Sequence, residues 1–233
     1  MGARRVGTWK DALRRATDAA IAGILPGGVG LVSILAQVDG YLYPHEAVLL
    51  YQLARSSPGA GAVVEIGSYR GRSTLCLAKG ARARGGTRVY AVDPHVYGTE
   101  ADLRENLRHF GMDGIVEPVV LPSVEAARDF RGDVRLLFVD GHHEEASVAA
   151  DLDAWLPKVV PGGFVLVHDS TDLGQFPGPA RVARERLVAG AGFDAVDRLG
   201  SITWAKLRGG ADPWLPPTRA KALDGLIRSL KGR

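Results

Sequence analysis

The sequence predicts an α/β fold in which a mostly parallel β-sheet is covered by helices on both faces. From residue 62 onward, short apolar segments alternate with segments of helical periodicity, which is the order expected of βαβ units. Most of the apolar segments are runs of Val, Ile, Leu and Phe with little polar alternation, as is typical of strands buried on both faces. The length of 233 residues fits one α/β domain with short extensions.

Predicted strands and helices follow one another at short spacing. Strands are expected at residues 62–66, 88–92, 115–121, 134–139 and 163–167, with helices at 73–83, 100–110, 124–130, 144–155 and 179–188. Two further strands, 193–199 and 202–207, are joined by a tight Gly200-Ser201 turn, which predicts an antiparallel hairpin. We expect a ligand outside the carboxyl ends of the parallel strands, where open α/β sheets bind.

Two segments flank this region. Residues 1–58 contain a predicted helix at 8–25, an apolar segment at 31–35 and a helix at 44–54. Residues 209–233 begin with a Pro/Gly-rich linker that leads to a final basic helix. The predicted ligand-binding and catalytic domain is therefore residues 59–208.

Composition and charge exclude several classes of protein. The net charge is +3, without the strong basic excess of a nucleic-acid-binding protein. Cys76 is the single cysteine, so an internal disulfide or a Cys-rich zinc site is excluded and a reducing compartment is favoured. No apolar run reaches the roughly 20 residues needed to span a bilayer. We therefore expect a cytoplasmic protein without a membrane span or a nucleic-acid partner.

A turn bracketed by glycines follows the first predicted strand, in Val63-Val64-Glu65-Ile66-Gly67-Ser68-Tyr69-Arg70-Gly71. Gly67 would let the backbone turn tightly and a ligand approach closely, and Gly71 would let the next helix pack against the strand. Glu65 stands where dinucleotide-binding turns have a glycine, and a carboxylate there would repel a pyrophosphate. Glu65 suits a ligand with a positively charged amine, such as S-adenosylmethionine. The alternative is a turn with a structural role alone.

Polar side chains also follow the second and third predicted strands. Asp93 ends the second strand, about 20 residues after the turn, where an acid can accept hydrogen bonds from ribose hydroxyls. The alternative for Asp93 is a turn or helix-cap role. Ser123 follows the third strand, where its side chain or nearby backbone could meet an adenine edge.

The spacing of these residues resembles that of class I S-adenosylmethionine-dependent methyltransferases. The resemblance covers about residues 40–207 and rests on Glu65-x-Gly67-x-x-x-Gly71, Asp93, Ser123, Asp140 and the final hairpin. It implies a Rossmann-like, doubly wound sheet of seven strands, six parallel and one antiparallel. It also implies a set of cofactor-binding residues: Glu65, Gly67, Ser68, Gly71, Ser73, Asp93, Ser123 and Asp140.

A narrower resemblance concerns two later segments of the chain. Phe138-Val139-Asp140-Gly141-His142-His143 and His168-Asp169 are similar to a bacterial subfamily that includes macrolide- and aminocoumarin-sugar O-methyltransferases. This similarity implies a hydroxyl acceptor on a sugar or another small molecule. It also implies a homodimer formed through N-terminal residues and a lid from the segment before the first strand. Tyr41 and Leu42 are candidates for that lid, and the favoured alternative for both is core packing against the sheet.

Acidic and histidine side chains follow the fourth and fifth predicted strands and supply candidates for the reacting end. An aliphatic alcohol needs a general base, a metal that acidifies it, or both, and aspartates offer the oxygen ligands that Mg²⁺ prefers. Resemblance to the catechol O-methyltransferase group places Mg²⁺ on Asp140, Asp169 and Ser170. Ser170 departs from the Asp or Asn of that group.

Two neighbouring histidines are candidates for the general base. The lysine base of the catechol O-methyltransferase group falls on His143, and a histidine titrates near neutrality. His142 is its rival, and Asp140 completes the predicted catalytic set. One of the two histidines could instead cap the following helix or pack in the loop.

These observations predict a Mg²⁺-dependent S-adenosylmethionine O-methyltransferase. Two other classes stay open at this point: an NAD(P)-dependent oxidoreductase, and a metal-dependent hydrolase or hydroxylase that uses the Asp/His cluster. Glu65, in the place of a glycine, counts against the oxidoreductase.

Overall fold

The computed structural model describes residues 17–21, 23, 28–209 and 218–231. The helices are α2 (Gly28–Gln37), α3 (Pro44–Ser56), α4 (Arg72–Ala83), α5 (Glu100–His109), α6 (Ser123–Asp129), α7 (Glu145–Trp155), α8 (Pro177–Ala183) and α9 (Thr218–Lys231). The strands are β1 (Ala62–Ile66), β2 (Val89–Val92), β3 (Val116–Val119), β4 (Val134–Val139), β5 (Val159–Val167), β6 (Phe193–Leu199) and β7 (Ile202–Leu207). A short 3₁₀ helix, Leu156–Lys158, follows α7, and a π-helical turn, Arg184–Val188, continues α8.

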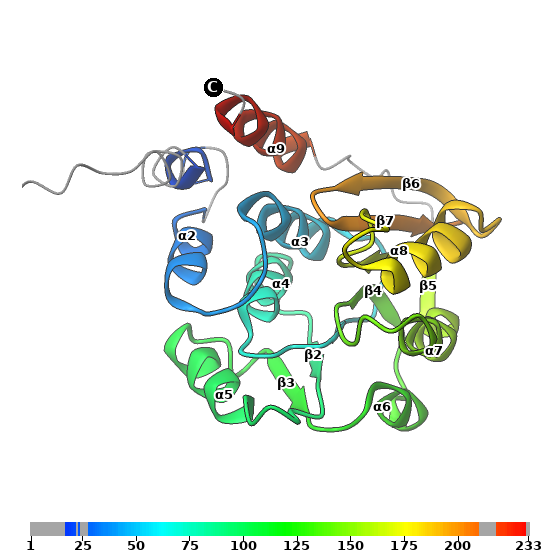
Figure 1. The fold of residues 1–233 in the computed structure, drawn as a ribbon. Helices are drawn as coiled ribbons and strands as arrows, with labels where there is room; N and C mark the ends of the chain where they lie inside the picture. The colour runs from blue at the N-terminus through cyan, green and yellow to red at the C-terminus, as the bar shows by residue number, and fades with distance from the viewer. Residues whose placement is uncertain (1–16, 22, 24–27, 210–217, 232–233) are drawn as a thin grey trace, which may run out of the picture.

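All the strands belong to one seven-stranded sheet with the order β3-β2-β1-β4-β5-β7-β6 (Figure 1). Strands β1 to β5 pair in parallel, and β7 is antiparallel to both β5 and β6. One strand therefore runs against the other six, which confirms the predicted fold class and the terminal hairpin.

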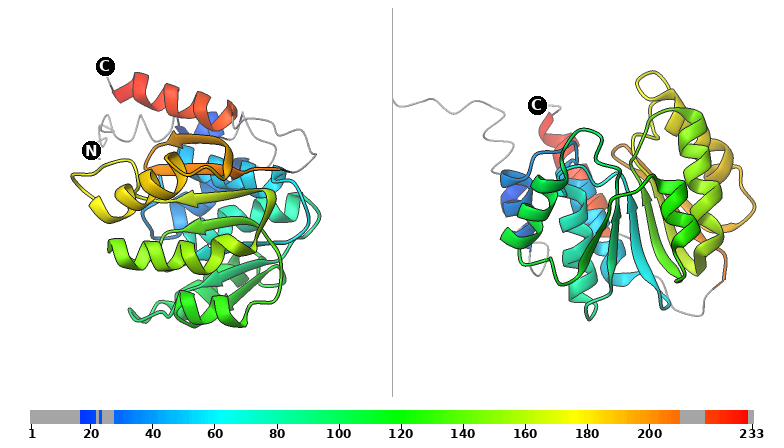
Figure 2. Two further views of the ribbon diagram at one scale, coloured as in Figure 1. Left: turned by 90° about the vertical axis from the view of Figure 1, so that its right-hand side faces the viewer. Right: turned by 90° about the horizontal axis from the view of Figure 1, so that it is seen from below.

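Side chains of the central strands alternate between two hydrophobic cores, one on each face of the sheet. In β4, Leu136 and Phe138 belong to the core shared with α2, α3, α4, α5 and α9. Leu137 and Val139 belong to the core shared with α6, α7 and α8. The right-hand view of Figure 2 shows the sheet between these two helical layers. Because α3 lies in the first layer, the segment before β1 packs directly on the sheet.

Several elements differ from their predicted bounds. Strand β5 begins at Val159 rather than at residue 163, because Val159 pairs with Val134 across a register shift in β4. The apolar segment at 31–35 lies inside helix α2. Most of the predicted helix at 8–25 and of the linker after residue 209 falls outside the described residues. Within the described ranges, no helix is both long and apolar enough to cross a membrane.

Arg135 fixes the end of α3 to the sheet from a buried position in β4. Its side chain is 1% exposed, and its guanidinium donates to Ala54 O at 2.6 Å and to Ser57 O at 3.2 Å. Burial lowers the pKa of Arg135 to about 10, so the side chain is still a cation at neutral pH. A cation suits the negative end of the helix dipole and satisfies carbonyls that the last turn leaves unpaired.

We expect Arg135→Met to lower the free energy of unfolding by about 2–4 kcal/mol, because buried carbonyls lose charged donors. The exposed Arg131 gives a matched control, and Arg131→Met is expected to change stability by less than about 0.5 kcal/mol. Urea denaturation measures both. Equal stability of the two variants would show that the buried guanidinium does not hold α3.

Candidate functional site

The carboxyl ends of β1, β2, β4 and β5 form one continuous rim. Three backbone hydrogen bonds extend the ladders beyond the strands: Gly67 N to Val92 O at 2.8 Å, Asp140 N to Ile66 O at 2.8 Å, and His168 N to Val139 O at 3.0 Å. The winding of the sheet reverses between β1 and β4. This is the topological switch point, where open α/β sheets bind ligands.

The two glycines of the turn after β1 are both required by their surroundings. Gly67 has φ +86°, and a Cβ atom there would lie 2.1 Å from Asp140 O, so the turn passes directly against the loop after β4. Gly71 has φ +90°, and its Cβ would lie 2.6 Å from Leu103 Cδ1 in α5. The prediction that Gly71 allows packing against the strand is thus corrected, because the close neighbour belongs to a helix.

Glu65 lies beneath this turn and is fully buried. Thr74 Oγ1 donates to Glu65 Oε2 at 2.5 Å. Burial raises the pKa of Glu65 to about 8, although hydrogen bonds from Ser73 and Thr74 act in the opposite direction. Among the described residues, Glu65 Oε1 and the buried Ser68 Oγ have no hydrogen-bond partner. Buried polar atoms are rarely left unpaired, so these two atoms fit a ligand that brings hydrogen-bonding groups of its own.

Asp93 connects the segments after β1 and β2 through hydrogen bonds. Its carboxylate accepts hydrogen bonds from Tyr69 N at 2.8 Å and His95 N at 2.7 Å. The turn role considered for Asp93 is therefore present, and each carboxylate oxygen still has acceptor capacity for a hydroxyl. Tyr69 and His95 have positive φ angles, as does Asp169 after β5. Such strained non-glycine residues cluster at ligand sites.

Ser123 is the first residue of α6, and it contacts two buried side chains of α7, Asp151 and Trp155. Trp155 Nε1 donates to Ser123 Oγ at 3.0 Å. A hydrogen bond also links Ser123 to Asp151, whose pKa is raised by burial. Asp151 and Trp155 were not among the predicted site residues, and they fix the side chain of Ser123 near the end of β3.

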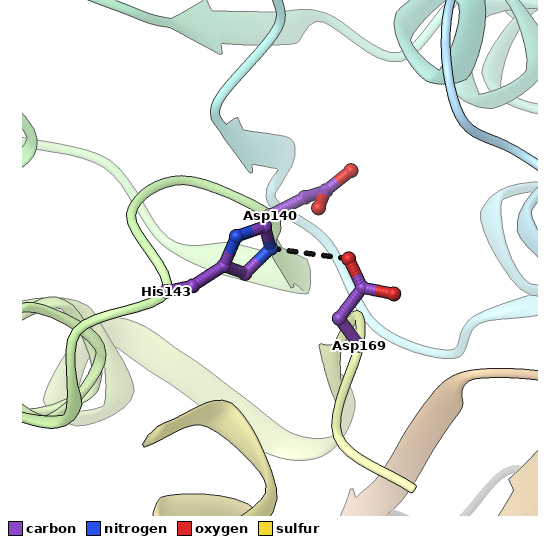
Figure 3. A group of neighbouring side chains, drawn as sticks. All are labelled: Asp140, His143 and Asp169. Atoms are coloured by element: carbon purple, nitrogen blue, oxygen red, sulfur yellow. Dashed lines mark ion pairs between the residues drawn. The ribbon is translucent and has the colours of Figure 1, made fainter. Parts of the chain in front are cut away.

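The loops after β4 and β5 bring three side chains together, as Figure 3 shows. One potential ligand atom from each of Asp140, His143 and Asp169 lies within 4.8 Å of the others. His143 Nε2 is 3.1 Å from Asp169 Oδ2, and the ring of Phe176 lies 4.6 Å from the His143 ring. His142 is exposed and lies outside this group.

His168 lies between the carboxylates at the base of the rim. Its Nδ1 is 3.1 Å from Asp140 Oδ1 and 3.2 Å from Asp169 Oδ2, and its Nε2 is 3.4 Å from Glu46 Oε2. Burial alone would lower the pKa of His168, but the three carboxylates raise it well above its ordinary value. Burial raises the pKa of Asp140, whereas contacts with His168 and His143 outweigh burial and lower that of Asp169.

Ser170 is not part of this group. Its side chain is 2% exposed, its hydroxyl donates to Val167 O at 2.7 Å, and it accepts a hydrogen bond from Thr203 N at 2.9 Å. The predicted ligand set Asp140, Asp169 and Ser170 is therefore corrected. The serine hydroxyl is used in fixing β7 to β5, and His143, not Ser170, is grouped with the two aspartates.

Comparisons with known proteins find similarity in sequence and in fold. Residues 64–170 match the family model described as a methyltransferase domain. The O-methyltransferase from Bacillus cereus in complex with SAH has 19% sequence identity to the chain and a TM-score of 0.63, with 83% of this chain and 97% of that chain covered. The O-methyltransferase TomG from Streptomyces achromogenes has 17% identity and a TM-score of 0.59, with coverage of 85% and 91%.

A curated relative matches a smaller part of the chain. The protein y4gI of Sinorhizobium fredii is 30% identical to this chain over an alignment 119 residues long, and the alignment covers 46% of this chain. The matched region spans 13% of that relative's length.

Residues 64–170 thus match a methyltransferase domain, and the described chain has the fold of the class I S-adenosylmethionine-dependent methyltransferases. This confirms the resemblance at the level of the class. The sugar O-methyltransferase subfamily stays a prediction.

Proposed function

We propose that the protein is an S-adenosylmethionine-dependent O-methyltransferase that methylates a hydroxyl group of a sugar or another small molecule. The observation that carries this proposal is the position of the His143–Asp169 pair, which shares a rim with Glu65 and Asp93 at the switch point of a methyltransferase fold. The match to a methyltransferase domain favours this function over an oxidoreductase and over a hydrolase or hydroxylase.

The cofactor would lie along the carboxyl ends of β1, β2 and β3. The unpaired oxygens of Glu65 and Ser68 would hydrogen-bond the polar methionine end of the cofactor. Asp93 would accept hydrogen bonds from its ribose, and Ser123 would meet the edge of its adenine. Gly67, Gly71 and Ser73 would shape the turn around it, and Asp140 would lie beside it at the end of β4. When bound, S-adenosylmethionine supplies an activated methyl group.

His143 is the residue that we assign to accept the hydroxyl proton. Asp169 Oδ2 faces Nε2 of the ring, and a carboxylate in that position favours the tautomer with a proton on Nε2. Nδ1 is then the nitrogen with a free lone pair. The Phe176 ring against His143 further fixes the orientation of the base. His142 lies outside the group formed by Asp140, His143 and Asp169, which favours His143 of the two candidates.

A divalent cation, Mg²⁺ in the sequence-based prediction, is the second component that we propose for the reacting end. Asp140 and Asp169 offer hard oxygen ligands and would hold Mg²⁺ with several waters retained. A cation bound there would make the acceptor hydroxyl more acidic.

The direct test is a screen of glycosides and small-molecule alcohols with methyl-labelled S-adenosylmethionine. We expect label transfer to a hydroxyl oxygen of at least one acceptor. Transfer only to nitrogen or carbon would overturn the assignment to O-methylation. A homodimer formed through the N-terminal residues is part of the same proposal, and light scattering of the full chain tests it.

We expect chelation with EDTA to lower the turnover rate at least about 10-fold, and added Mg²⁺ to restore it, because a bound cation stabilises the developing alkoxide. Initial rates before and after dialysis against EDTA measure this effect. Full activity after exhaustive chelation would leave the His143–Asp169 pair as the sole means of removing the proton.

A further inference from the structure

Glu46, in the first turn of α3, is a fully buried carboxylate whose partners are all hydrogen-bond donors. Tyr43 N donates to Oε2 at 2.8 Å, and Ser201 donates to Oε1 through its backbone N at 2.7 Å and its Oγ at 2.9 Å. The fourth contact is His168 Nε2 at 3.4 Å. One carboxylate therefore connects the start of α3, the β6–β7 turn and the rim of the site. Burial alone would raise the pKa of Glu46, but these hydrogen bonds lower it below its usual range.

The alternation of side chains along β5 explains why His168 meets α3. Phe164 and Leu166 belong to the core beneath α3 and α4, so the next alternate position, His168, faces the same layer. Phe138, from the same core, supports the His168 ring edge-on at 6.0 Å. The ring is thereby held between α3 on one side and the loops after β4 and β5 on the other.

The hydrogen bond of His168 to Glu46 is made by Nε2. Nδ1 faces oxygens of Asp140 and Asp169, and Nε2 faces an oxygen of Glu46. An ionised carboxylate can only accept hydrogen bonds. The Glu46 contact therefore fixes the ring so that its other nitrogen points at the two aspartates.

The contacts continue outward from His168, through Asp169, to the exposed side chain of His143. Asp169 Oδ2 lies 3.2 Å from His168 Nδ1 and 3.1 Å from His143 Nε2. The four side chains thus form a series in which acid and imidazole alternate: Glu46, His168, Asp169 and His143. Asp169 is thus contacted by the His168 imidazole, and Glu46 in turn contacts that ring from the other side.

We infer that Glu46 is a positioning residue for the methyl-transfer site, acting through His168 and Asp169 on His143. This inference rests on the proposed function. It assigns part of the active site to α3, outside the region 64–170 that matches the methyltransferase domain. A neutral side chain at position 46 would leave His168 Nε2 without a charged acceptor, and Asp169 would lose a fixed partner.

The test compares Glu46→Gln with Arg135→Met. Both variants weaken the attachment of α3, but Arg135 holds the opposite end of the helix and lies outside the series. We expect Glu46→Gln to lower kcat about 10- to 100-fold, as is usual when an outer-shell partner is removed, with little change in the KM for S-adenosylmethionine. Arg135→Met should retain wild-type kcat at a temperature well below its unfolding transition.

A spectroscopic readout separates positioning from simple stability. In protein labelled with ¹⁵N-histidine, the buried ring of His168, 3% exposed, should give two slowly exchanging ring N–H signals, which His168→Gln identifies by their loss. Glu46→Gln should shift or remove the Nε2–H signal, and Arg135→Met should leave it in place. Unchanged His168 signals and unchanged kcat in a folded Glu46→Gln protein would overturn the inference.

This readout does not depend on methyl transfer. If no acceptor is ever methylated but the His168 signals respond as expected, the proposed function fails while the contact between Glu46 and His168 stands. If methylation is normal in Glu46→Gln, the positioning role fails while the proposed function stands.

Discussion

Replacing His143 with alanine is expected to lower kcat by about 10²- to 10⁴-fold, the usual contribution of a general base. The His143 side chain is exposed, and its Nε2 lies 3.1 Å from Oδ2 of the half-buried Asp169. The affinity for S-adenosylhomocysteine should stay at the wild-type value, because His143 is not among the residues proposed to contact the cofactor. Initial rates and calorimetric titration measure the two quantities.

The matched control is His142→Ala, which removes an exposed imidazole from the neighbouring position. We expect it to change kcat less than about threefold, because the side chain lies outside the group formed by Asp140, His143 and Asp169. If His142→Ala loses the activity and His143→Ala retains it, the base has been assigned to the wrong histidine.

Replacing Gly67 with alanine is expected to lower the free energy of unfolding by about 2–5 kcal/mol and to abolish cofactor binding. Two effects add. A left-handed backbone at φ +86° costs a residue with a Cβ about 1–2 kcal/mol. The Cβ would also lie 2.1 Å from Asp140 O, so the ends of β1 and β4 must separate, and overpacking of this kind adds about 1–3 kcal/mol.

Gly98 provides the control that separates these two effects. It also has a positive φ, +70°, but no atom lies within 4 Å of a Cβ built there. Gly98→Ala should therefore lose only the backbone contribution of about 1–2 kcal/mol and bind the cofactor normally. Equal losses of stability for the two variants, with binding retained in both, would contradict the close approach of the turn to Asp140.

The order of strands and helices was predictable from the sequence because each element carries its own local pattern. The predicted bounds of β1, β4 and the terminal hairpin are those of the structure. Strand β5 was predicted too short, since its first residues include Pro161-Gly162-Gly163, which locally disfavour a strand. Their pairing depends on β4, a partner distant in sequence.

The candidate site was predictable where its residues follow strand ends, and not where contacts cross the chain. Asp140, His143 and Asp169 follow β4 and β5, so parallel pairing alone brings them together. Glu46 lies 122 residues from His168; within α3 its pattern indicates only an acid in the first turn of a helix. Ser170 appeared to be a ligand from its position, but its neighbours on β7 determine its hydrogen bonds.

Calorimetric titration of S-adenosylmethionine into the protein at pH 7, in two buffers of different ionisation enthalpy, tests the cofactor site most directly. Because burial raises the pKa of Glu65 to about 8, this carboxyl group is protonated in most of the protein molecules at pH 7 before a ligand binds. An ammonium group beside Glu65 favours the ionised form, so we expect saturable one-to-one binding with release of up to about one proton. Glu65→Gln should bind more weakly and release none. Absence of binding, or binding with the same proton release in Glu65→Gln, would contradict this account of the site.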